Sequence, residues 1–143
     1  MLDLLERARA IAACPLFEGL APAVVVRLAE RAHVAELVPG ERRTTEDTIW
    51  VVARGVLGVA VREDSTDVTA SILRRRGAPA TPGHALGLVR VVRSGTPIVE
   101  AMAQEPSVLV GIGFDDIRDV LEEDPAALAA IADRLAALLS VAA

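Results

Sequence analysis

The segment of residues 82–101 holds the residue types that could bind a small anionic ligand. It combines three glycines with two arginines, namely Gly83, Gly87, Gly95, Arg90 and Arg93. Glycines let backbone N–H groups turn inward and approach an anion closely, and arginines supply charge-assisted hydrogen bonds. The same residues also fit a turn, a short apolar helix and a second turn. Three glycines and two arginines more often belong to such a structure than to a ligand site. If the chain binds a small ligand, we expect the site in this segment.

Two amphipathic helices are expected before this segment. Apolar residues recur at helical spacing over residues 2–13, and Pro15 ends that helix. The apolar pair at 16–17 is expected to insert into the core. Pro22 is well placed to begin the second helix, which we expect to end at His33 because a cation near a helix C-terminus is mildly favoured. The face shared along this second helix consists of Val24, Val25, Leu28, Ala29 and Ala32.

Apolar and β-branched segments predict six strands in the middle of the chain. They span residues 34–38, 49–53, 56–61, 68–73, 98–102 and 108–112. Pro39 and Gly40 form a turn dipeptide after the first of them, and the polar run 41–48 follows that turn. A second turn, residues 104–107, divides the last two strands.

Two more helices are expected after the strands. In the first, Phe114, Ile117, Val120 and Leu121 share one face. Asp124 is a suitable cap for the second, which starts at Pro125. Its apolar stripe consists of Leu128, Ile131, Ala132, Leu135, Leu138 and Leu139. Packing on the domain is the commoner use of such a stripe, whereas an exposed stripe would predict a homodimer through this helix.

This order of elements predicts a mainly β member of the α+β class. Short strands joined by Gly and Pro turns and flanked by terminal helices indicate a small antiparallel barrel or jelly roll. A chain of 143 residues is long enough for one domain that buries about two-thirds of its unfolded surface. We therefore expect a single domain over 1–143, with helices in 2–32, the barrel in 34–112, the ligand segment in 82–97 and the C-terminal helices in 114–142.

Charge and cysteine content limit the partners and the compartment. The net charge of −5 and the isoelectric point near 5.0 argue against nucleic acid as a partner, because phosphate neutralisation needs a basic face. The run Arg74-Arg75-Arg76 is the one cationic cluster, and a solvated strand end is its ordinary use. Cys14 has no second cysteine to pair with, and no segment suits a signal peptide or a bilayer crossing. We expect a cytoplasmic protein that needs no membrane and no cofactor.

The sequence offers no catalytic constellation. His33 and His84 lie far apart in the chain, and neither stands beside a cysteine or a second histidine. No serine lies in a nucleophile elbow, and no paired acids stand at metal-ligand spacing. We therefore expect neither an enzyme nor a metal site.

Four groups of residues together resemble the cyclic nucleotide-binding domain family, the sensor modules of catabolite activator proteins, protein kinase A regulatory subunits and cyclic-nucleotide-gated channels. Residues 15–20 are similar to the family's P-L-F-x-G-L opening, and residues 38–41 to its P-G-E turn. Residues 49–59 resemble its central pair of strands, and residues 101–125 its last strands and the helix after them. The resemblance covers nearly the whole chain and implies a jelly roll with a phosphate-binding cassette.

The cassette departs from the family pattern at its two charged positions. The resemblance implies a Gly-Glu pair, in which the glutamate binds the ribose hydroxyl, and a later Arg-Ser/Thr-Ala group, in which the arginine pairs with the cyclic phosphate. Here Gly87 keeps the glycine position, but Leu88 replaces the glutamate and Gly95 replaces the arginine. Thr96 keeps the hydroxyl position. Hydrogen bonds to charged groups contribute about 1.5–3 kcal/mol each, so losing both would weaken an inherited site by about two to four decades.

Two hypotheses of function follow from this degenerate cassette. The first is a non-catalytic regulatory or interaction module that binds cyclic nucleotide weakly or not at all and acts through a protein partner or a fused output domain. The second is a working sensor of cyclic AMP, cyclic GMP or another small anion, in which Arg90 or Arg93 has taken over the phosphate contact. The candidate ligand residues are the same for both, namely Gly87, Leu88, Arg90, Arg93, Gly95 and Thr96.

Overall fold

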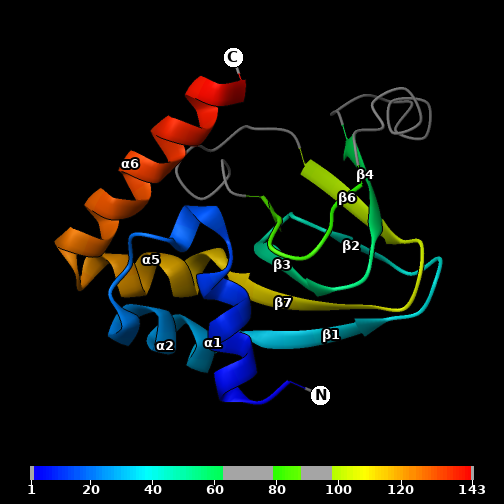
Figure 1. Ribbon diagram of the computed structural model, residues 1–143, viewed down its shortest axis with the longest axis horizontal. Coiled ribbons are helices and arrows are strands. Elements are labelled where there is room, and N and C mark those ends of the chain that lie inside the picture. Colours follow the sequence, from blue (N-terminus) through cyan, green and yellow to red (C-terminus); the bar gives the residue numbers. More distant parts are fainter. Residues whose placement is uncertain (1, 63–78, 88–97, 143) are drawn as a thin grey trace.

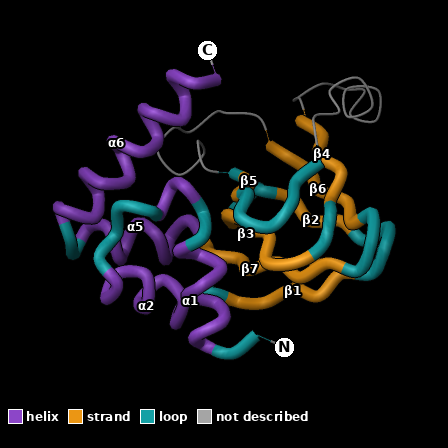
Figure 2. Tube along the Cα trace, in the orientation of Figure 1, coloured by secondary structure: helices purple, strands orange, loops and turns teal. Residues whose placement is uncertain are grey.

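Helices and strands occupy separate parts of the molecule (Figures 1 and 2). The computed structural model describes residues 2–62, 79–87 and 98–142. The helices are α1 (Leu4–Ala12), the 3-10 turn η1 (Pro15–Phe17), α2 (Pro22–Arg31), α5 (Phe114–Glu122) and α6 (Pro125–Ala142). The strands are β1 (His33–Leu37), β2 (Arg42–Thr44), β3 (Thr48–Arg54), β4 (Leu57–Arg62), β5 (Ala85–Leu86), β6 (Ile98–Ala103) and β7 (Ser107–Gly113).

The N-terminal helices begin at residues that suit a helix start. Asp3 caps α1 in a capping box, since its side chain accepts the N–H of Glu6 at 2.8 Å. Pro22 is the first residue of α2, as expected from its fixed φ and missing N–H. The expected end of that helix at His33 is wrong. The helix stops at Arg31, and His33 opens β1, where it pairs with Gly111 across the sheet.

The described strands form two antiparallel sheets, one in the order β1-β7-β3-β5 and the other in the order β2-β6-β4. Among the described strands, each one lies in the other sheet from the strand before it in the sequence, so every connection from β1 to β7 passes from one sheet to the other. The mainly β, jelly-roll class is thereby confirmed. Two strands were not expected: β2 lies in the polar run 41–48 and β5 in the ligand segment. The expected strand at 68–73 lies outside the described residues.

The first sheet is the middle layer of the molecule, and its strands β3 and β7 are buried on both faces. One face packs on the helices through a cluster that includes Ile49, Val51, Val110 and Ile112. The other face packs on the second sheet through a smaller cluster. That cluster consists of Ala35, Leu37, Trp50, Val52, Leu57, Ala80, Ala101, Ala103 and Leu109. Because both faces are covered, β3 is apolar at consecutive positions instead of alternating.

The C-terminal helices confirm one expected face and correct another. The face of α5 is buried as predicted, and Asp124 accepts the N–H of Ala127 at 3.1 Å as the cap of α6. The stripe on α6 is not a single surface. Ile131 and Leu135 are buried, together with Ala127, whereas Leu128 is 47% exposed and Ala132 is also exposed. The side chains of residues 138–142 lie outside what the structure describes.

Candidate functional site

A pocket of about 310 Å³ lies between η1, β4 and β5. Its walls come from three distant parts of the sequence, which the fold brings together. The lining residues are Cys14, Pro15, Leu16, Val59, Pro79, Ala80, Gly83, His84, Ala85 and Leu86. All of them except His84 present apolar side chains, a thiol or backbone to the pocket, so the described wall carries no charged side chain.

Backbone hydrogen bonds hold residues 80–86, which form one side of the pocket, on the neighbouring strands. Ala80 and Leu57 exchange two N–H···O bonds of 2.8 and 3.0 Å, which tie residues 79–80 to the start of β4. Val52 of β3 also makes two backbone hydrogen bonds to this wall. Its carbonyl accepts the Gly83 N–H at 3.0 Å, and its N–H donates to the backbone carbonyl of His84 at 2.9 Å. Leu86 then pairs with Trp50 in the sheet. This wall is therefore held by the sheet itself.

His84 is the polar side chain of the described wall. Its Nδ1 lies 3.0 Å from the N–H of Thr81, which donates to it. A nitrogen that accepts a hydrogen bond carries no proton, so the neutral ring has its proton on Nε2. Within the described residues Nε2 has no hydrogen-bond partner. The His84 ring can therefore donate one hydrogen bond to a ligand.

The chain before and after residues 88–97 contacts Thr45. Gly87 has φ +93°, and a Cβ there would lie 2.9 Å from Cβ of Thr45, so both the backbone and the space require glycine. On the exit side, the Val99 N–H donates to Oγ1 of Thr45 at 2.9 Å, and the Thr45 N–H donates to the Val99 carbonyl at 3.0 Å. Thr45 is 1% exposed. Thr45 is therefore a buried anchor that contacts both the end of β5 in the first sheet and the start of β6 in the second.

Of the predicted site residues, the structure describes Gly87 alone. Leu88, Arg90, Arg93, Gly95 and Thr96 lie outside the described residues, as does the arginine run at 74–76. Sequence reasoning missed Thr45, His84 and the Cys14–Leu16 wall. No signal near Thr45 marked it, because its role depends on a strand more than fifty residues away, as its bond to Val99 shows.

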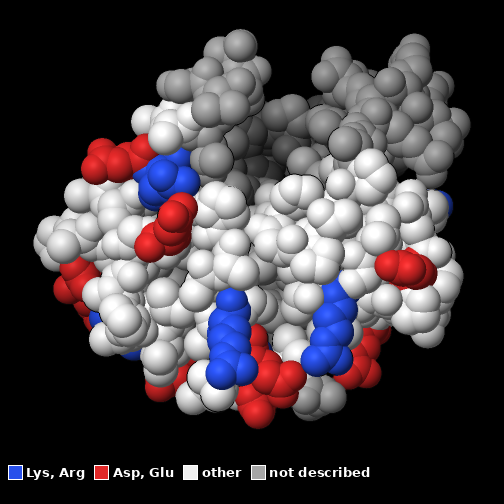
Figure 3. All heavy atoms as spheres, viewed as in Figure 1, with Lys and Arg blue, Asp and Glu red and all other residues white. Residues whose placement is uncertain are grey.

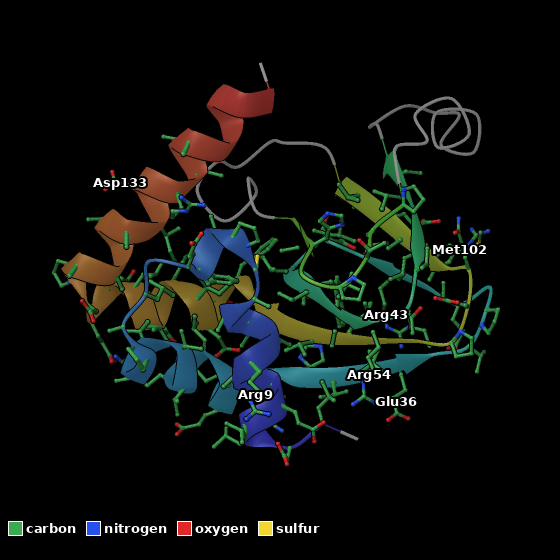
Figure 4. The ribbon with its side chains drawn as sticks, viewed as in Figure 1. Arg9, Glu36, Arg43, Arg54, Met102 and Asp133 are labelled. Carbon is green, nitrogen blue, oxygen red and sulfur yellow. The ribbon has the colours of Figure 1, made fainter. Side chains whose placement is uncertain are left out.

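The described arginines are engaged with acids or lie away from the pocket. Arg134 pairs with Glu18 at 3.0 Å, Arg31 with Asp119 at 3.3 Å, and Arg27 with Glu123. On the face in Figure 3 most of the surface is uncharged, and the blue side chains stand beside red ones. Figure 4 places Arg9 on α1 and Arg43 and Arg54 over the strands, away from η1. None of the described arginines lines the pocket.

Cys14 contributes a thiol to the pocket wall and is 1% exposed. Burial raises the pKa of this thiol above its usual value of 9.0, and the N–H groups of Leu16 and Phe17 offset part of that effect.

We expect iodoacetamide to alkylate Cys14 slowly in the folded protein at mildly alkaline pH and rapidly after unfolding, because the thiolate is the nucleophile. Mass spectrometry of timed samples measures both rates. Equal rates would show that the thiol is open to solvent.

The same shift makes stability depend on pH. Since the pKa is raised on folding, the unfolded chain loses the proton first. The contribution of the neutral, buried thiol to the free energy of unfolding is fully present below pH 9.0 and is lost as the pH rises through the pKa of the folded state. Cys14→Ala should remove this part of the pH dependence in urea denaturation.

Comparison with solved structures identifies the fold. The sensor domain of the transcriptional regulator DNR from Pseudomonas aeruginosa superposes with a TM-score of 0.71 at 14% identity, covering 96% of this chain and 92% of that one. The regulatory domain of Toxoplasma gondii protein kinase A, solved with cyclic AMP, gives 0.70 at 11% identity, covering 96% of this chain and 49% of that one. A cyclic nucleotide-binding-like protein from Brucella abortus gives 0.61 at 21% identity, covering 82% and 98%.

The sequence comparisons are negative. No family model matches the chain, and no curated protein matches it. The identities to these three solved structures are below a quarter, so the likeness rests on three-dimensional arrangement. That arrangement agrees with the motif order found in the sequence, from the Pro15–Phe17 turn to the helix that starts at Phe114. The chain therefore has the fold of the cyclic nucleotide-binding domains.

Proposed function

We propose that the chain is a non-catalytic regulatory module of cyclic nucleotide-binding fold that binds cyclic nucleotide weakly or not at all. The observation that carries this proposal is the residue after Gly87. Gly87 follows β5 with φ +93° and keeps the glycine of the family pattern. The next residue is Leu88, where the family pattern has a glutamate. A leucine cannot accept the hydrogen bond of a ribose hydroxyl.

The described pocket supports the same proposal. A cyclic phosphate carries a negative charge, and moving it out of water is costly unless a cation or several donors compensate. The described wall offers one neutral donor, His84, and no charged side chain. Compensation would have to come from Arg90 or Arg93, which is the alternative hypothesis.

A regulatory role, as opposed to an enzymatic one, is part of this proposal, and it is supported by the likeness to the sensor domain of a transcriptional regulator and to a kinase regulatory domain. The His33 ring packs edge to face on Trp50 with the centroids 5.1 Å apart, which is a structural use of the histidine. Among the described residues no three His, Cys, Asp or Glu side chains gather at one place as metal ligands would.

The output of the module is proposed to lie in a partner or a fused domain. The similar Pseudomonas structure is the sensor domain of a transcriptional regulator, and this chain spans 49% of the kinase regulatory chain that it resembles. The exposed side of α6, with Leu128 and Ala132, is the surface through which a homodimer would form. In the described part of the chain no helix has the length and apolar character that a membrane crossing needs.

Isothermal calorimetry with cyclic AMP and cyclic GMP tests the proposed function. We expect no binding tighter than about 0.1 mM, since a micromolar site would lose about two to four decades with its two charged contacts. The matched gain-of-function variant is Leu88→Glu/Gly95→Arg, which restores the residue types of the family pattern and should bind measurably better than the wild type.

The alternative predicts the opposite result. Micromolar binding by the wild-type chain, abolished by Arg93→Ala, would overturn the proposal and establish a sensor with a relocated arginine. Binding that persists in Arg93→Ala and disappears in Arg90→Ala would assign the same role to Arg90.

A further inference from the structure

The pocket between η1 and β5 has the size of a small-molecule site. Ligand pockets in proteins commonly occupy about 300–1,000 Å³ and combine an apolar wall with a few polar groups. This pocket, at about 310 Å³, lies at the lower end of that range. Proline, alanine, valine and leucine side chains form most of its described wall, which suits a ligand that is more apolar than a nucleotide.

The polar content of the described wall specifies the ligand further. The His84 ring accepts the Thr81 N–H at Nδ1, which leaves Nε2 as a donor. The Cys14 thiol is a weak donor that burial keeps protonated, since burial raises its pKa. Neither group compensates a full negative charge. A neutral ligand with one hydrogen-bond acceptor matches this wall.

We infer that this pocket binds a small, neutral, predominantly apolar molecule whose single acceptor atom takes a hydrogen bond from His84. The inference deepens the proposed function and rests on it, because it assigns a ligand class to a site that would bind cyclic nucleotide poorly. Occupation by such a molecule needs no cation, and no charged side chain lies in the described wall.

Three probes of one shape test the ligand class. The carbonyl of 2-acetylnaphthalene is an acceptor, 2-ethylnaphthalene lacks an acceptor, and 2-naphthoate replaces the carbonyl group with a charged carboxylate. Titrations of the full chain are followed by amide chemical shifts in two-dimensional NMR. We expect the ketone to bind most tightly and the carboxylate most weakly, with amide shift changes at residues 14, 16 and 83–86. No binding by the ketone, or binding of the carboxylate at equal affinity, would overturn the inference.

Two variants test the location and the hydrogen bond. Val59→Trp places an indole in the pocket and should abolish binding of the ketone, whereas Val38→Trp, at a position 61% exposed and outside the pocket wall, should leave it unchanged. His84→Ala should weaken the ketone by about three- to tenfold, as expected for one neutral hydrogen bond, and should leave 2-ethylnaphthalene unaffected. Thermal melting confirms that each variant is folded. Ala85→Phe fills the same pocket if Val59→Trp fails to fold.

The outcomes separate this inference from the proposed function. Unchanged binding in the folded pocket-filling variant would place the probe elsewhere and overturn the inference, while the calorimetric result with cyclic nucleotide would stand. Micromolar cyclic nucleotide binding would overturn the proposed function, whatever the neutral probes do. An equal loss of the ketone and of 2-ethylnaphthalene in His84→Ala would remove the hydrogen bond from the inference and contradict it.

Discussion

Gly55→Ala is expected to destabilise the protein by about 2–5 kcal/mol, because it combines backbone strain of roughly 1–2 kcal/mol with overpacking of roughly 1–3 kcal/mol. Gly55 joins β3 to β4 at φ +96°. A Cβ there would lie 2.6 Å from Cβ and 2.7 Å from Cα of Ser107, and that residue is 2% exposed and opens β7. Since the clash involves backbone, no side-chain rotation relieves it.

Gly40→Ala is the matched control for this variant. Gly40 has a nearly equal φ of +93°, but a Cβ there meets nothing within 4 Å. We expect a loss of about 1–2 kcal/mol from strain alone. Urea denaturation followed by the fluorescence of Trp50, the one tryptophan in the chain, measures both free energies of unfolding. Equal losses in the two variants would mean that the close approach to Ser107 does not contribute.

Phe17→Ala should cost about 3–5 kcal/mol, the usual effect of truncating a large aromatic side chain in a core. Phe17 is 1% exposed and belongs to the cluster between the helices and the first sheet. The turn that carries it also holds α6, because Arg134 donates to the Pro15 carbonyl at 3.1 Å. We therefore expect the cavity left by the variant to loosen α6 as well as to lower the global stability.

Leu5→Ala serves as the comparison for Phe17→Ala. Leu5 is 58% exposed on α1, and its truncation should change the free energy of unfolding by no more than about 0.5 kcal/mol. Denaturation gives the stability of both variants, and amide hydrogen exchange reports on α6. A loss below about 1 kcal/mol for Phe17→Ala would show that the site refills and that η1 is not a core element.

The strands that the sequence predicted best are those whose residues are apolar because they are buried. Residues 49–53 are apolar at every position, and the structure explains this because β3 is covered on both faces. The strand β2 was missed because Arg42, Arg43 and Thr44 have no strand-like pattern, and their pairing with β6 supplies what local sequence does not. The distribution of β3 and β4 between two sheets was equally invisible, since it depends on partners far along the chain.

The position of the site was predictable, but its wall was not. The Gly87 position followed from the resemblance, and the structure gives it the conformation that requires glycine. His84 was judged by its neighbours in sequence, whereas its setting comes from the Thr81 turn and from the η1 residues on the far side of the pocket. A helical pattern likewise grouped Leu128 with Ile131, although one is 47% exposed and the other 3%.

The place of β7 in the first sheet has a consequence for biosynthesis. β7 separates β1 from β3 and pairs with both, so that His33 faces Gly111 and Ile49 faces Ile112. A chain emerging from the ribosome therefore cannot join these strands until residues 107–113 have been made. Before that moment β1 and β3 expose edges that lack their central partner, and such edges invite pairing with other chains. Rapid delivery of the last third of the chain would protect the nascent protein from aggregation.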